Sequence, residues 1–255
     1  MSDNWNTYFS HIDNKPASYL LDMDPWSDGE HEEFVHLYRL SVILNEPNED
    51  GLTTQEEAAV LNRMEDVLND SLSRRYLFVG RITTNGRRDF YYYTDSADGE
   101  ELQSRADKAV RHYQYHINRV EEEKPRDFYY ESLFPSKSER QRIANRQLIE
   151  QLRALGDQLE KPRTVNHWIY FDSATSCNQF KDNVQQAGFR IENQDSEDNK
   201  HSLRISRDDV VQFHAISEVT DYLVAVSEEY EGDYDGWETK VIKGSILSRL
   251  FKAKK

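Results

Sequence analysis

The chain has 255 residues, of which 31% are charged, and a formal net charge of −15. Nucleic-acid binding depends on a basic face that attracts phosphates, so this charge argues against a nucleic-acid binder and favours basic partners. The chain also contains 15 tyrosines, 11 phenylalanines and 4 tryptophans. Because disordered chains are poor in aromatics, the sequence indicates a folded protein of one large domain or two small ones.

The first half of the sequence predicts two strands, a helix, a β-hairpin, a second helix and a last strand. Thr54 and Glu57 fit a capping box at the start of the first helix. Asn85-Gly86 predicts the turn of the hairpin, since both residues tolerate positive φ. In chain order the elements are expected at 16–24, 34–44, 52–72, 76–95, 99–113 and 113–120.

A boundary is expected in ESLFPSKSERQR, where Pro135 ends the first half and Ser138 with Gln141 fits a capping box that opens a new helix. Gly156 should end this helix, and Gly188 should end the next one as its C′ residue. The later elements are expected at 165–172 (strand), 173–188 (helix), 189–194 and 201–208 (strands), 217–230 (helix) and 235–243 (strand). The polar segment 195–200 is expected to be a loop.

Both halves therefore read β-α-β-β-α-β, with an additional strand or helix in front. This pattern predicts an α+β protein of two ferredoxin-like plaits, each an antiparallel sheet with two helices on one face. We expect domains at 1–135 and 136–243, followed by a basic C-terminal tail at 244–255. The other face of each sheet is left open, and open faces tend to be buried against a partner or a sister domain.

An acidic run stands out near the end of the chain. Between Glu228 and Glu238 it holds six acids, three aromatics and no base, whereas the chain from Lys240 onward holds six bases and no acid. Strand alternation predicts that Trp237 and Val241 point into the core and that Tyr234 points outward. So dense a charge repels itself and costs stability, which favours a use beyond solubility.

The strand Arg87–Tyr93 offers an alternative function. Arginines beside strand aromatics are typical of sheets that stack RNA bases. Phe90 and Tyr92 share one face of the strand, and Tyr91 and Tyr93 share the other. If one pair packs under the helices, the other pair is available to bases or to the second domain, although the glycine pattern of RNA-binding strands is missing.

A metal-dependent enzyme in the first half is a further alternative. Asp22 and Asp24 share a strand face, where two carboxylates could act as acid and base or hold a cation. His112 and His116 are four residues apart, but no third ligand accompanies them. The single cysteine, Cys177, excludes an intramolecular disulfide and lies on a predicted core stripe, which is typical of an inert thiol. We therefore expect no catalytic residue, cofactor or metal.

The compartment follows from the same features. A lone cysteine indicates a reducing environment. The start, MSDNWNTYFSHIDNKP, lacks the basic and apolar regions of a signal peptide, and no apolar run approaches the length of a membrane span. We expect a cytoplasmic protein.

Three segments of the second half resemble the regulator of ribonuclease E activity B family (RraB). They are KPRTVNHWIYF, FKDNVQQAGFRI and EEYEGDYDGWET, in this order, and the similarity covers about residues 137 to 243. The first half, with NEPNEDGL, MEDVL, GRITTNGRRDFYYY and ESLFPS, is similar to an uncharacterised domain family that often precedes the RraB domain.

The resemblance implies a bacterial, non-enzymatic protein with a ferredoxin-like fold that binds and inhibits a ribonuclease E-like endoribonuclease. Such partners carry arginine-rich segments, which an acidic aromatic surface would suit because carboxylates accept bidentate guanidinium bonds and tyrosines stack on them. The partner-binding residues are then expected to be Glu228, Glu229, Glu231, Asp233, Tyr234, Asp235 and Glu238.

Overall fold

The structure is a computed structural model that describes residues 4–27, 29, 31–197 and 200–243. Backbone proximity divides the chain into two compact units, Met1–Pro135 and Ser136–Lys255. The expected basic tail, 244–255, lies outside the described residues. None of the helices in the described ranges is long and apolar enough to cross a membrane.

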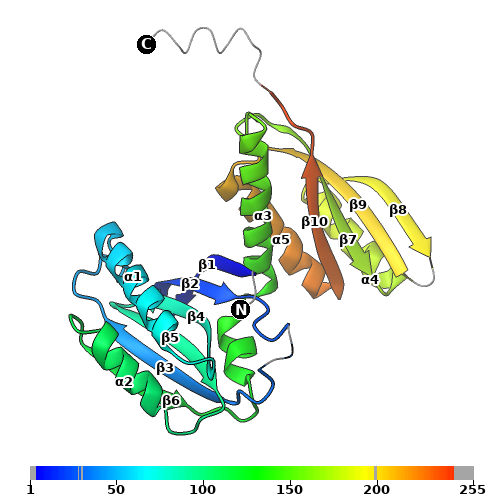
Figure 1. Cartoon of the computed structure of the whole chain (residues 1–255). Coiled ribbons are helices and arrows are strands. Elements are labelled where there is room, and N and C mark those ends of the chain that lie inside the picture. Colours follow the sequence, from blue (N-terminus) through cyan, green and yellow to red (C-terminus); the bar gives the residue numbers. More distant parts are fainter. Residues whose placement is uncertain (1–3, 28, 30, 198–199, 244–255) are drawn as a thin grey trace, which may run out of the picture. The chain divides into compact units, whose positions relative to one another are not determined.

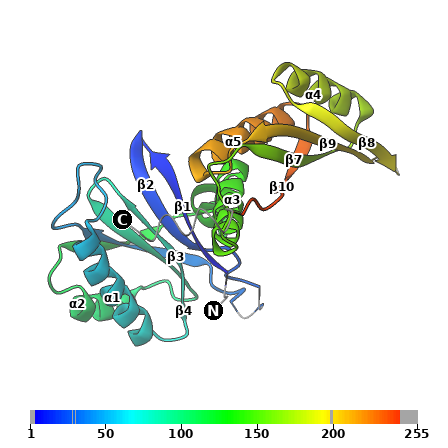
Figure 2. The ribbon, with the colours of Figure 1, turned by 90° about the horizontal axis from the view of Figure 1, so that it is seen from above.

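The first unit is a six-stranded antiparallel sheet with two helices side by side on one face (Figures 1 and 2). Its strand order is β1-β2-β4-β5-β3-β6. The elements are β1 (Trp5–Ile12), β2 (Lys15–Asp22), β3 (His36–Ile43), α1 (Gln55–Ser71), β4 (Tyr76–Thr84), β5 (Arg87–Thr94), α2 (Glu100–Ala109) and β6 (Tyr115–Val120). The elements from β3 to β6 form the expected ferredoxin-like plait, and the β1–β2 hairpin extends the sheet beyond β4.

The sequence analysis did not predict strand β1. It pairs along its whole length with β2, and the two strands meet at Asp13 and Asn14, which both adopt positive φ, 51° and 62°. Asp and Asn tolerate this conformation, so Asp13-Asn14 is the sequence feature from which this hairpin could have been predicted. The predicted Asn85-Gly86 turn is confirmed, with φ values of 47° and 76°.

Helix α1 begins as predicted at Thr54, whose side chain accepts a hydrogen bond from the backbone N–H of Glu57. The carboxylate of Glu57 does not complete a capping box. It accepts instead from the backbone N–H groups of Asn45, at 2.7 Å, and Glu46, at 3.2 Å. The buried carboxylate thus ties the start of α1 to the end of β3.

The second face of the first sheet is covered by the unit's own loops and by a short π-helix, η1 (Tyr129–Leu133). The hydroxyl of Tyr93 donates to a carboxylate oxygen of Glu122 at 2.7 Å, and the ring of Trp26 meets that of Tyr93 edge-on. The ring of Phe128 lies 5.3 Å from that of Tyr91. Both faces of the central strand β5 are therefore buried within the first unit.

The second unit is a four-stranded antiparallel sheet in the order β10-β7-β9-β8, which is the predicted ferredoxin-like plait. Helices α4 and α5 lie on one face of the sheet (Figure 2), and α3 packs against α5. The elements are α3 (Lys137–Ala154), β7 (Arg163–Phe171), α4 (Ala174–Gln186), β8 (Arg190–Glu197), β9 (Lys200–Asp209), α5 (Phe213–Glu229) and β10 (Gly232–Thr239).

The capping box of α3 lies two residues before the predicted one. Ser136 is the N-cap, its hydroxyl accepts from the backbone N–H of Glu139, and the Glu139 carboxylate accepts from the backbone N–H of Ser136. The expected pair of Ser138 and Gln141 is wrong, because Ser136 offers the same spacing directly after Pro135. A carboxylate at this position also interacts favourably with the helix dipole, which an amide does not.

Three other expectations concern the middle of this unit. Gly156 and Gly188 follow the ends of α3 and α4 with φ of 78° and 85°, as predicted. Cys177 is fully buried in the core, and burial raises the pKa of its thiol, which fits an inert residue. The expected loop 195–200 is wrong in extent, because Asp195 pairs with Ser202 and the strands β8 and β9 continue into it.

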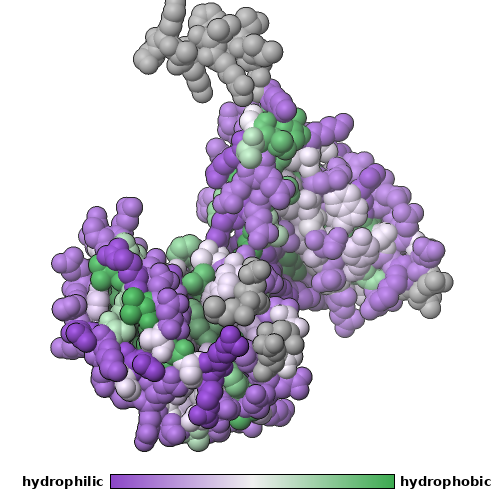
Figure 3. Space-filling view, viewed as in Figure 1, coloured by the Kyte–Doolittle hydropathy of each residue, from purple (hydrophilic) through white to green (hydrophobic). Residues whose placement is uncertain are grey.

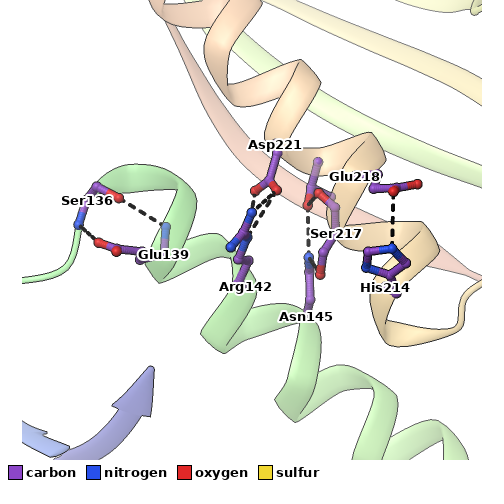
Figure 4. A network of polar contacts seen from close by, with 9 residues as sticks. Ser136, Glu139, Arg142, Asn145, His214, Ser217, Glu218 and Asp221 are labelled. Carbon is purple, nitrogen blue, oxygen red and sulfur yellow. Dashed lines mark hydrogen bonds and ion pairs between the residues drawn. The ribbon is translucent and has the colours of Figure 1, made fainter. Parts of the chain in front are cut away.

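Asn145 joins α3 to the rest of the second unit. Its amide donates to the hydroxyl of Thr220 at 2.8 Å, and its oxygen accepts from the indole N–H of Trp237 at 2.7 Å. Arg142, one turn earlier on α3, makes a bidentate ion pair with Asp221 of α5 (Figure 4). A buried polar side chain is tolerated when its hydrogen bonds are satisfied, so Asn145 fixes how α3 lies on α5 and β10.

A β-bulge in β10 determines which side chains face the core. The pairing with β7 shifts between Tyr234, opposite Ile169, and Gly236, opposite Trp168, so Asp235 is the additional residue. Gly236 adopts φ of 144°, a conformation that side chains with a Cβ rarely take. The bulge changes the alternation, so that Tyr234 and Trp237 both point toward the helices.

Two sequence expectations about this strand are therefore wrong. Tyr234 does not point outward: its hydroxyl is hydrogen-bonded to Nδ1 of the fully buried His167 at 2.8 Å, and burial raises its pKa well above the usual value. Val241 does not point into the core, since it is 39% exposed beyond the end of β10. The inward orientation of Trp237, which is 8% exposed, is confirmed.

Replacing Asn145 by alanine should destabilise the second unit by about 2–4 kcal/mol, because the buried Trp237 indole N–H loses its acceptor and the hydroxyls of Ser217 and Thr220 lose a donor. Urea unfolding measured by Trp fluorescence tests this. The matched control is Glu150→Ala, an exposed position on the same helix, which should change the free energy of unfolding by at most about 0.5 kcal/mol. Equal effects of the two changes would contradict the assigned role of Asn145.

The second unit should lose stability as the pH falls from 6.5 toward 3. Burial lowers the pKa of His167 from 6.5 to about 3, so between these values the unfolded chain binds a proton that the folded chain does not. One proton corresponds to a slope of at most about 1.4 kcal/mol per pH unit. Hydrogen exchange of the β7 amides across this range should show a shallower slope for His167→Gln than for the wild type, and parallel slopes would refute the prediction.

Candidate partner-binding face

All six acids of the predicted run are exposed on the second unit. Glu228 and Glu229 end α5, and Glu231 lies in the turn that follows, with positive φ. The remaining acids are Asp233, Asp235 and Glu238 of β10. The run is therefore a continuous acidic surface from a helix end to a sheet edge, without Tyr234, whose side chain lies inside.

Helices α4 and α5 leave the opposite face of the second sheet open among the described residues of this unit. Along β7 the helix-facing residues are buried, whereas Trp168 and Tyr170 point to the open face. Trp168 is half-buried, and the side chain of Tyr170 is 42% exposed. In Figure 3 this face is turned toward the viewer, and pale side chains gather over the strands between hydrophilic neighbours.

The register of the sheet brings the aromatic and acidic residues together. Asp233 lies opposite Tyr170, and Glu238 lies opposite Asn166, one row beyond Trp168. Gly236 lies directly opposite Trp168, so no side chain of β10 covers the indole from that position. Asp235, at the bulge, lines a groove with Trp168 and Gly236, and α3 forms its other side with Gln141, Ala144 and Leu148. We call Trp168, Tyr170, Asp233, Asp235 and Glu238 the acidic face.

Basic groups accompany this surface on two sides. The ammonium group of Lys137, at the start of α3, lies 3.7 Å from the Glu228 carboxylate and 3.5 Å from that of Asp233. Exposed ion pairs of this kind contribute little to stability and are readily exchanged. Arg204 of β9 lies opposite Trp168 on its other side. Carboxylates beside open aromatic rings suit guanidinium and ammonium groups, through charge-assisted hydrogen bonds and cation–π contacts.

Trp168 and Tyr170 are the residues of this face that the sequence analysis missed. They stand two apart in VNHWIYF, within a predicted strand, so the alternation placed them on one side. Which side the helices cover could not be read from this strand alone, because aromatic residues suit both a core and an exposed face. The bulge, which removes Tyr234 from the surface, also left no clear signal beyond Gly236.

The RNA-binding alternative lacks the surface that it requires. Phe90 and Tyr92 pack under the helices of the first unit, as expected for one pair. The other pair, Tyr91 and Tyr93, is also buried, with exposures of 2% and 0%. Arg88 is buried too and donates to Thr83 and Asn62. The hypothesis of an RNA-stacking strand at Arg87–Tyr93 is therefore wrong, because the unit's own loops occupy the second face.

The metal-site candidates of the first unit are not assembled into a site. Asp22 is fully buried and accepts from the backbone N–H of Asp24, while the Asp24 side chain is exposed. His112 lies in the turn after α2, whereas His116 lies on β6. Within the described ranges, the structure has no group of three or more histidine, cysteine, aspartate or glutamate residues placed to hold a metal ion.

A comparison with curated proteins finds no match. Among solved structures, the crystal structure of an unknown protein from Galdieria sulphuraria is 14% identical, with a TM-score of 0.24, and the alignment covers 81% of this chain and 99% of that one. A putative glycine cleavage system transcriptional repressor is 10% identical, with a TM-score of 0.23, and the alignment covers 80% and 98%. At these TM-scores neither similarity bears on function.

Two family models match consecutive parts of the chain. Residues 142–239 match the family described as regulator of ribonuclease activity B, and this match contains the whole acidic face. Residues 3–134, just over half of the chain, match the family of unknown function DUF695. The arrangement of two families that the sequence resemblance predicts is thus confirmed. The chain belongs to the DUF695 family, and its second unit matches the regulator of ribonuclease activity B.

Proposed function

We propose that the protein is a non-catalytic regulator that binds a ribonuclease E-like endoribonuclease through the acidic face and inhibits it. The observation that carries the proposal is the family match to a regulator of ribonuclease activity over residues 142–239. Every residue of the acidic face lies within this match. The aromatic rings and carboxylates of the face are the groups that would contact the partner.

The proposed mechanism is competition with RNA for basic segments of the enzyme. Arginine-rich segments bind RNA phosphates by charge and stack on its bases. The acidic face offers the same two interactions, carboxylates for guanidinium groups and the rings of Trp168 and Tyr170 for stacking. The acids at the end of α5, Glu228, Glu229 and Glu231, extend the negative field and should speed the encounter more than they strengthen the complex.

We assign partner binding to the second unit and no activity to the first. The unit's own helices and loops cover both faces of the central strand β5, as the burial of Tyr91 and Tyr92 illustrates. The second sheet keeps one face open among the described residues of its unit. The DUF695 unit would then contribute something other than the ribonuclease contact. The reduced, buried thiol of Cys177 suits the cytoplasm, where we place the protein.

Reversing Asp233, Asp235 and Glu238 to lysine should weaken binding to a ribonuclease E-type enzyme, or to an arginine-rich segment of it, by at least tenfold. Three attractive contacts become repulsive, and each reversed charge should weaken the binding free energy by about 0.5–1 kcal/mol or more. Titration calorimetry of the full chain measures the effect. Wild-type binding should also weaken as salt rises, because exposed charges are screened beyond about 8 Å at physiological ionic strength.

The matched control reverses three exposed acids of α1, Glu56, Asp66 and Asp70, which changes the net charge by the same amount on the first unit. This variant should bind with nearly wild-type affinity. Equal losses in the two variants would show that binding follows net charge alone, and wild-type affinity in both would remove the acidic face from the mechanism.

Replacing Trp168 by alanine should weaken the same complex by about 1–2 kcal/mol, because a guanidinium group loses its stacking surface. Unlike the charge reversals, this loss should persist at high salt. Calorimetry at low and high salt separates the two contributions. The comparison variant is Val67→Ala, an exposed apolar residue of α1 that should have no effect on binding. A Trp168 effect that vanishes at high salt would contradict a stacking role.

A further inference from the structure

We propose that the C-terminal segment 244–255 docks on the acidic face of its own molecule and masks it until a partner displaces it. The proposal concerns the regulation of the face assigned above and in that respect rests on the proposed function. The docking itself needs no partner, so it can be measured separately. It is carried by three features: where the chain leaves the second unit, the composition of the segment, and the chemistry of the face.

A buried ion pair fixes the point from which the segment departs. Asp157, in the loop after α3, accepts from the guanidinium group of Arg163 and from the backbone N–H of Ile242, both at 2.6 Å. The backbone N–H of Gln158 donates to the carbonyl of Ile242 at 2.9 Å. Arg163 donates further to the carbonyl of Lys240. The residues after β10 are therefore held against the second unit up to Lys243.

The segment matches the acidic face in charge and in apolar content. It carries Arg249, Lys252, Lys254 and Lys255 without any acid, and among them are the apolar residues Ile246, Leu247, Leu250 and Phe251. The face offers three carboxylates beside two open aromatic rings. Charge alone would suit any acidic surface, but a segment with both basic and apolar residues suits a face on which carboxylates of β10 lie beside Trp168 and Tyr170 of β7.

The distance between the exit and the face is within reach. Thr239 is the last residue of β10 and pairs with Val165, so the chain leaves at the Glu238 end of the acidic face. The chain stays held to the unit as far as Lys243, ten residues beyond Asp233, so the segment starts at most about 35 Å from Asp233. A segment of 12 residues spans at most about 40 Å when extended. A short tether of this kind gives an effective concentration on the order of millimolar, so weak contacts suffice for docking.

Paramagnetic relaxation in the full-length protein tests the docking. A nitroxide is attached at Ala253→Cys, and the buried Cys177, which is 0% exposed, should remain unlabelled. At about 0.1 M salt the amide signals of Trp168 and Gly236 should lose at least half of their intensity, whereas those of α1 should not. Raising the salt to about 1 M should restore the signals, because the screening length shrinks to about 3 Å.

Two variants determine whether the contact has the proposed chemistry. Changing Arg249, Lys252, Lys254 and Lys255 to glutamine should abolish the broadening, and so should the reversal of Asp233, Asp235 and Glu238. The reversal of Glu56, Asp66 and Asp70 is the control and should leave it intact. Broadening that is absent in the wild type, or that survives both changes, would overturn the inference. Broadening that disappears on dilution would also overturn it, since the segment would then lie on a second copy.

A binding experiment links the docking to the proposed function. The glutamine variant of the tail should bind a synthetic arginine-rich peptide several-fold more tightly than the wild type, because the internal competitor is weakened. Unchanged affinity would overturn the masking role. The relaxation experiment contains no ribonuclease, so an absent docking signal would overturn the docking inference and leave the proposed function untouched. A ribonuclease that fails to bind the glutamine variant would instead overturn the proposed function and leave the docking untouched.

Discussion

The extra residue at Asp235 decides what the second unit presents to its surroundings. Because β10 is bulged there, Tyr234 and Trp237 both point toward the helices, where they bind His167 and Asn145. The same bulge places Gly236, which has no side chain, opposite Trp168. One local irregularity thus completes the core on one face of the sheet, and on the other it leaves the half-buried indole of Trp168 without a β10 side chain above it.

The two units use the same plait in different ways. In the first, the loops around Trp26 and the short helix η1 close the second face of the sheet, and the aromatics of β5 become core residues. In the second, the additional helix α3 precedes the plait and packs against α5, on the side that already carries helices. Among the described residues of this unit, no helix covers the second face of the sheet. The loops and η1 of the first unit, more than the plait itself, account for this difference between the two sheets.

The acidic face combines two interactions with different ranges. The carboxylates act through a field that salt screens, whereas the rings of Trp168 and Tyr170 act only in contact. Both interactions suit a basic segment of another protein as well as the basic segment 244–255 of this chain. If the proposed docking holds, competition between a tethered and a free ligand would make the protein's affinity adjustable.

The sequence by itself determined the two plaits, the hairpin at Asn85-Gly86 and the exposure of the six acids. These features follow from local rules: hydrophobic periodicity, the φ preferences of Asn and Gly, and the cost of burying unpaired charge. Only the tertiary structure decided whether the side chains of Tyr234, Trp168 and the β5 aromatics lie in a core or on a surface. An aromatic side chain suits a core and an open face equally well, so its environment depends on a bulge in its own strand and on loops far along the chain that cover one sheet and leave the other open.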